Sequence, residues 1–208
     1  MSSVLSKRPS LARYLSIDTA RRYGIYVFFA VLVIASGVFS PTFLRRDNVV
    51  NMLMQFAPLG IVVIGQVFVI LVGGLDLSVA SVMATAAVIA TGFDGTNASA
   101  PAIFGATVAM CMCSGLLNGL LVTKRQVSPF LATFATAVVL EGLRFAYTQG
   151  APSGNVPPVF HEMGTGFAAG LPVNILILAA CATVFGVLLH RSTFGRRVFM
   201  VGGNSESA

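Results

Sequence analysis

The sequence predicts an all-α fold, a polytopic transmembrane helical bundle of about six helices, and three observations lead to it. Of the 208 residues, 56% are hydrophobic and only 10% are charged, whereas a soluble domain carries about 25% charged residues. The mean hydropathy is +0.86. Because a membrane-spanning helix needs roughly 20 mainly apolar residues, a chain of this length has room for about six crossings.

The first crossing is predicted at Tyr26 to Val38, and the second apolar run is unusually long. Phe56 through Gly92 contains Asp76 as its single ionisable residue. A continuous helix of that length would extend roughly 55 Å, although the hydrocarbon core is only about 30 Å thick. The helix therefore either projects far from the membrane or breaks near Val72-Gly73-Gly74-Leu75-Asp76 and crosses twice.

The distribution of Lys and Arg favours the break, because basic residues concentrate on the cytoplasmic side of membrane proteins. With a break, only Arg45 and Arg46 lie in outside loops, and the other loop and terminal Lys and Arg residues lie inside. Without it, every later loop changes side, and seven of these Lys and Arg residues, Arg45 and Arg46 included, lie outside against five inside. The broken arrangement predicts that both ends of this chain are cytoplasmic.

The remaining crossings are predicted at Pro101 to Val122, Pro129 to Thr148 and Leu171 to Leu189. The Gly- and Pro-rich stretch Gln149 to Gly170 suits a loop or a short surface helix. The sequence thus divides into a cytoplasmic tail (1–22), a transmembrane domain (23–190) and a cytoplasmic segment (191–208).

Several classes of function are excluded by absent motifs. A phosphate-binding loop needs Gly-Lys-Ser/Thr, and the lysines follow Ser6 and Thr123 instead. The Gly-x-Ser-Gly form of an intramembrane protease is missing, and three cysteines in apolar stretches indicate neither disulfides nor a zinc site. The basic clusters flank apolar segments and so indicate membrane orientation rather than nucleic acid. We expect no enzyme activity, catalytic residue, cofactor or metal.

Asp76 is the most informative ionisable residue, because a carboxylate beside a membrane span usually faces protein, water or a functional path. Alternatively, Asp76 or Ser78 caps the next helix while Gly73 and Gly74 allow the turn. A cap that also lines a path satisfies both interpretations. Glu141 and Arg144, three residues apart, are expected to pair on one helix face.

The segment after the last crossing combines Phe194-Gly195, two arginines, an apolar run and Gly202-Gly203-Asn204. It is either an ordinary basic anchor or a short amphipathic element on the membrane surface with handles for a partner protein.

Three segments together resemble the permease subunits of ribose-, xylose- and galactoside-type bacterial ABC importers. They are Asn51 to Gln55 continuing to Gly73-Gly-Leu-Asp-Leu-Ser-Val79, then Gly115-Leu-Leu-Asn-Gly119 leading to Val127–Thr133, then Thr193-Phe-Gly-Arg-Arg197 with Val201-Gly-Gly-Asn204 and Glu206.

The resemblance implies a subunit in the bacterial inner membrane that translocates a monosaccharide such as a pentose. It also implies a cytoplasmic ABC ATPase subunit, a periplasmic sugar-binding protein and a second permease subunit as partners, besides membrane lipid. The substrate-path candidates are Gly73, Gly74, Asp76 and Ser78. The ATPase-coupling candidates are Thr193, Phe194, Gly195, Arg196, Arg197, Gly202, Gly203, Asn204 and Glu206.

Two departures from the family pattern stand out. Ala80 replaces a common glycine, and the chain stops at Ala208, where members continue with further helices; we expect it to cover the N-terminal two thirds of a permease. The alternatives are the same architecture for a nucleoside, a branched-chain amino acid or a signalling sugar, an ion-coupled transporter using Asp76, and a membrane scaffold that transports nothing.

Overall fold

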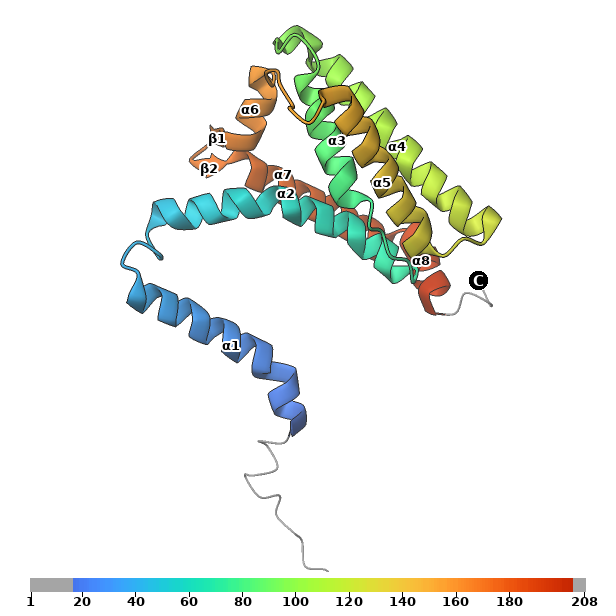
Figure 1. The fold of residues 1–208 in the computed structure, drawn as a ribbon. Coiled ribbons are helices and arrows are strands. Elements are labelled where there is room, and N and C mark those ends of the chain that lie inside the picture. Colours follow the sequence, from blue (N-terminus) through green and yellow to red (C-terminus); the bar gives the residue numbers. More distant parts are fainter. Residues whose placement is uncertain (1–16, 204–208) are drawn as a thin grey trace, which may run out of the picture. The chain divides into compact units, whose positions relative to one another are not determined.

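The computed structural model describes residues 17–203, with side chains from residue 23, and these residues form mainly helices (Figure 1). Asn204 and Glu206 lie outside the described residues. The elements are α1 (Ile17–Phe39), α2 (Arg46–Leu71), α3 (Val79–Thr91), η2 (Asn97–Ser99), α4 (Ala100–Arg125), α5 (Pro129–Thr148), α6 (Pro158–Thr165), β1 (Phe167–Ala168), β2 (Leu171–Pro172), α7 (Val173–Arg191) and α8 (Thr193–Gly203).

The chain divides into two compact units, residues 1–52 and 53–208. In the first unit, α1 contains the predicted crossing but begins earlier, at Ile17. A short turn leads into α2. The side-chain amide of Asn48 stabilises this turn by donating to the carbonyl of Phe43 at 2.7 Å. Leu44 packs against Gly37 from the far side of this turn.

In the second unit, the predicted break separates α2 from α3. The chain turns at Gly73, whose φ of +77° favours glycine, and Gly74 N donates to Val69 O at 2.9 Å to close the last turn of α2. The backbone then runs without helix to Ser78, and α3 begins at Val79. The break is therefore confirmed, and α3 is short: its 13 residues extend about 20 Å.

Four helices in the described part of the chain are long and apolar enough to cross a membrane: α2, η2 with α4, α5 and α7. The apolar helices Tyr23–Phe39 and Val79–Thr91 are shorter. All six predicted apolar segments are helical, and the all-α polytopic fold is confirmed. By length alone α3 is less than a crossing of the roughly 30 Å hydrocarbon core, so the sequence overestimated this element.

A proline inside α2 accounts for one contact between α2 and α7. Pro58 has no N–H to donate to the carbonyl of Met54 four residues earlier. The side chain of Asn174, in the first turn of α7, donates to Met54 O at 2.8 Å instead. A buried amide thus replaces the missing helical hydrogen bond and connects the two helices.

Helices α3 and α5 run parallel, with α4 antiparallel beside them, as Figure 1 shows. We call the end where α4 turns into α5 the Lys124 end; the break and α8 also lie there, because Val201 lines a cavity with Gly73 and Pro129. We call the opposite end, where α3 turns toward α4, the Asp94 end. There Gly154 packs against the carbonyl of Thr91.

The segment predicted as a loop or surface helix contains α6, which confirms the helical alternative, followed by a two-residue antiparallel ladder between β1 and β2 that was not predicted. Few apolar side chains are fully buried, among them Ile103 and Ala132, and most apolar side chains on the long helices are exposed. Such an apolar surface is expected of helices that face lipid or further transmembrane helices.

Candidate functional site

Side chains of two neighbouring helices supply the backbone hydrogen bonds that the break removes. Thr133 Oγ1 on α5 accepts from Leu77 N at 3.0 Å and lies 3.2 Å from Leu75 O. Gln66 Nε2 on α2 donates to Asp76 O at 2.9 Å. Because unpaired backbone groups cost several kcal/mol in a lipid environment, these contacts make the non-helical segment tolerable inside the bundle.

Asp76, at the end of the break, accepts hydrogen bonds from Ser78, the residue that directly precedes α3. Its Oδ1 accepts from Ser78 N at 2.8 Å and from Ser78 Oγ at 2.6 Å. The N-cap residue of α3 is Ser78, yet its own side chain makes no capping hydrogen bond. Asp76 Oδ1 therefore forms a local turn with Ser78, and neither of the two predicted capping residues bonds a free N–H group of the first turn of α3. Ser78 is only 2% exposed.

The hydrogen bonds continue from Ser78 across the bundle. Asn118 Nδ2 on α4 donates to Ser78 Oγ at 3.3 Å, and Thr136 Oγ1 on α5 donates to Asn118 Oδ1 at 2.6 Å. Asn118 is only 7% exposed. A connected polar chain thus links the break, α4 and α5, and it fixes the position of the Asp76 carboxylate relative to both helices.

Two cavities meet at Asp76. The first, about 380 Å³, lies between α2, α3 and α4 and includes Gln66, Ser78 and Cys111 in its wall. The second, about 570 Å³, lies between the break, α4 and α5, and Gly73, Gly74 and Val201 contribute to its wall. Asp76 and Gly115 line both. The predicted substrate-path residues therefore line one or both of these cavities, and the Asp76 carboxylate lies between them. Each cavity is large enough for a small molecule.

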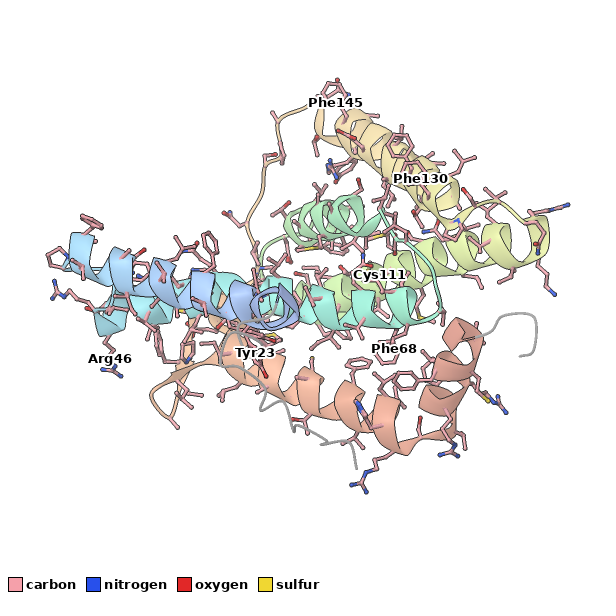
Figure 2. All side chains as sticks on the ribbon, turned by 90° about the horizontal axis from the view of Figure 1, so that it is seen from below. Tyr23, Arg46, Phe68, Cys111, Phe130 and Phe145 are labelled. Carbon is pink, nitrogen blue, oxygen red and sulfur yellow. The ribbon has the colours of Figure 1, made fainter. Side chains whose placement is uncertain are left out.

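The amphipathic element predicted after the last crossing is the helix α8, and it packs on α2 and α7. Phe194 lies 6.1 Å from Phe68, whose ring in turn meets Phe185 edge to face at 5.9 Å (centroid distances). Phe68 is labelled in Figure 2. Gly195 and Val198 are buried, and Gly195 N donates to Ser192 Oγ at 3.0 Å.

Gly202 brings the C-terminal part of α8 into direct contact with the end of α2. Its Cα sits so near the carbonyl oxygen of Leu71 that no side chain fits between them. Gly203, the next residue, has open space where a side chain would be. Arg196 and Arg197 are exposed. Among the described coupling candidates, Phe194, Gly195 and Gly202 therefore pack against α2 or α7, whereas Arg196 and Arg197 are exposed.

Arg144 has a different partner from the one predicted. Glu141 is exposed, whereas Arg144 is partly buried on the face of α5 that packs against α3, and its Nη1 lies 3.5 Å from Ser81 O. The predicted ion pair with Glu141 is not formed among the described residues, because the Arg144 side chain reaches toward α3 while Glu141 stays exposed. Sequence reasoning also missed Gln66, Asn118, Thr133 and Thr136, although each is a polar residue within an apolar helix, which is a usable signal.

Comparison with known proteins assigns the chain to a family. The family described as "Branched-chain amino acid transport system / permease component" matches residues 48–208. The chain belongs to this permease family. The matched residues begin in the first turn of α2 and include the break, the hydrogen-bonded chain at Asp76 and α8.

Several similar curated proteins are permeases for ribose or L-arabinose. The ribose import permease protein RbsC of Bacillus subtilis is 35% identical over 90% of this chain and 59% of its own length. The L-arabinose transport system permease protein AraH of Escherichia coli is 34% identical, over 90% and 57%. RbsC of Escherichia coli is 30% identical, over 85% and 56%. The chain thus spans less than three fifths of each of these relatives. No solved structure matches it.

Proposed function

We propose that this chain acts in the transmembrane permease subunit of an ATP-binding cassette importer that moves a monosaccharide, such as a pentose, across a bacterial inner membrane. The similarity to ribose and L-arabinose permeases supports a sugar over the amino acid in the family's description. The observation that carries the mechanism is the packing of α8 on the end of α2, next to the break at Gly73.

Charge distribution supports a cytoplasmic Lys124 end. Its basic residues come from the α4–α5 turn and from the region of α8, whereas the two loop segments at the Asp94 end, 92–99 and 149–172, contain no Lys or Arg. Basic residues accumulate on the cytoplasmic side of membrane proteins. In this orientation α8 faces the cytoplasm and α6 faces the periplasm.

The free arginines of α8 suit it to dock on a cytoplasmic ATPase subunit. Arg196 and Arg197 are exposed for an acidic partner surface, while Phe194 and Gly202 connect the same helix to α2. When the ATPase binds ATP and moves α8, the contact with Leu71 transfers the displacement to the residue that directly precedes the break. ATP hydrolysis itself belongs to the partner, so this subunit is a transporter component and not an enzyme.

The break then acts as the moving part of the sugar path. Asp76 Oδ1 is engaged by Ser78, which leaves the second carboxylate oxygen to accept from a sugar hydroxyl in either adjoining cavity. Gln66 contributes a polar side chain to the wall of the first cavity, and Gly115 leaves space there because it has no side chain. A sugar is neutral, so its hydroxyl groups need hydrogen-bond acceptors such as this carboxylate oxygen but no positively charged residue beside them. A periplasmic sugar-binding protein delivers the sugar at the Asp94 end, and a second permease subunit covers exposed apolar helix faces.

Uptake by the assembled importer tests this function. The chain, its partner ATPase and the binding protein are reconstituted in liposomes, and uptake of D-ribose, L-arabinose and leucine is measured with and without ATP. We expect ATP-dependent uptake of a pentose, and we expect Asp76→Asn to lower it at least tenfold while the thermal unfolding temperature changes little. Leucine uptake alone would favour the branched-chain amino acid alternative. Uptake that follows a proton gradient without ATP would contradict the proposal and favour an ion-coupled transporter.

A further inference from the structure

A second group of polar residues lies between α3 and α5 at the Asp94 end, well separated along both helices from Asp76. Two adjoining cavities, of about 370 and 430 Å³, share Val88, Gly92 and Tyr147 in their walls. We call the pair the Tyr147 cavity. Its volumes fall within the range of small-molecule sites, roughly 300 to 1,000 Å³.

One lobe of the Tyr147 cavity is lined with hydroxyl groups. Thr91 Oγ1 and Thr148 Oγ1 donate their protons to carbonyls of their own helices, the latter to Arg144 O at 2.9 Å, and so they present lone pairs. Ser153 and Tyr147 lie in the same wall. Within the described residues their hydroxyl groups have no hydrogen-bond partner, so they are free to donate or accept.

The other lobe is apolar and contains one cation. Ile89, Phe93 and Leu143 line it together with Arg144. The side chain of Arg144 reaches toward the first turn of α3, where Nη1 makes a single long contact of 3.5 Å with Ser81 O. A guanidinium group has five N–H donors, and an ionisable residue within a membrane span usually marks a functional site.

The rim of the cavity is pre-formed. Gly154 packs directly on the carbonyl of Thr91, and the neighbouring Asn155 packs against Gly95. The loop that follows α5 is thereby held against the loop that follows α3. A pre-formed rim reduces the ordering cost of binding.

We propose that the Tyr147 cavity binds a monosaccharide as a separate site, ahead of the break at Asp76 on the transport path; this rests on the proposed function. Hydroxyl acceptors, hydroxyl donors and a guanidinium fork match the alternating hydroxyl groups of a sugar, and the exposed Tyr147 ring offers a flat face for its C–H bonds.

The composition of the wall selects this ligand class over two others. The ammonium group of an amino acid is held most favourably by a carboxylate, and neither lobe is lined by Asp or Glu. A lipid phosphate would bind Arg144 at the end of the bundle, but the Arg144 guanidinium reaches away from that end toward Ser81. A neutral solute that carries many hydroxyl groups remains.

A tryptophan reporter tests the site directly, because the chain contains no tryptophan. Tyr147→Trp is introduced, the importer complex is placed in nanodiscs without binding protein, and emission relative to the wild-type complex is followed during titration with D-ribose or L-arabinose. We expect a saturable change, with half-saturation shifted at least tenfold by the additional substitution Arg144→Gln. Phe145→Trp is the matched control: Phe145 is about as exposed as Tyr147, 66% against 70%, but it lines neither lobe and points away from α3 in Figure 2.

A second pair of substitutions keeps the test independent of the reporter. Thr91→Val with Ser153→Ala removes two hydroxyl groups but keeps shape, so the sugar concentration for half-maximal change should rise while the unfolding temperature holds. A complex that transports normally but shows no saturable signal at position 147, or equal signals at 145 and 147, overturns the site. A signal that needs anionic lipid and ignores sugar overturns it as well. A wild-type complex that takes up no monosaccharide refutes the proposed function instead.

Discussion

Gly202 of α8 lies against the backbone carbonyl of Leu71, the last residue of α2, with no room for a side chain between them. The contact joins the helix that carries two exposed arginines to the residue that precedes the break. If α8 moves as proposed, we expect the displacement to reach the Asp76 region through this backbone contact, without passing through a flexible side chain.

Replacing Gly202 with alanine should disrupt this contact. An inserted methyl group must push α8 away from Leu71, and overpacking of this kind costs about 1 to 3 kcal/mol. We expect sugar uptake to fall at least tenfold while ATP hydrolysis by the reconstituted complex persists. Gly203→Ala is the control, because the position has open space; equal effects of the two substitutions would refute the role of the Gly202 contact.

Thr133→Val should destabilise the second unit, because the valine cannot accept from Leu77 N. Leaving that donor unpaired costs about 1 to 3 kcal/mol, and the unfolding temperature in nanodiscs measures it. Thr183→Val provides the comparison, since Thr183 is exposed and its hydroxyl contacts only Ala179 O of its own helix. A smaller loss for Thr133→Val than for Thr183→Val would argue against the support of the break by α5.

Asn174→Leu should leave the carbonyl of Met54 without a donor, at a cost of about 1 to 3 kcal/mol. In a Pro58→Ala background the new alanine N–H can donate to that carbonyl, so the same substitution should cost less. A double-mutant cycle measures the difference. Identical costs in both backgrounds would show that Asn174 does not compensate for the proline.

Asp94 should stabilise its loop in a pH-dependent way. Its carboxylate accepts from Thr96 N at 3.0 Å, and this hydrogen bond lowers the pKa of Asp94 below its ordinary value. Because the pKa is lower in the folded state, the stabilisation is present above the ordinary aspartate pKa of about 3.9 and is lost as the pH falls through the lowered value. Asp94→Ala should accelerate amide exchange at Thr96 near neutral pH and have no effect in strong acid; a constant difference across the range would contradict this.

The sequence was sufficient to predict the break, because the apolar run is too long for one crossing and contains Gly73, Gly74 and Asp76 together. It could not predict the partners that stabilise the break. Thr133 and Gln66 contact it across helices, and no local pattern reports such a contact. The interpretation of Arg144 was wrong for a related reason: spacing along one helix says which residues are neighbours, but it does not show that α3 offers the Arg144 side chain a backbone carbonyl at Ser81.

The dependence of Leu77 on Thr133 has a consequence for biogenesis. The two residues are 56 positions apart, so when α2 and α3 first leave the ribosome their hydrogen-bonding partner on α5 has not yet been synthesised. Until α5 is made, the N–H of Leu77 lacks this partner, at a cost of about 1 to 3 kcal/mol. We therefore expect α2 and α3 to be less stable in the bilayer by themselves than after α4 and α5 have joined them.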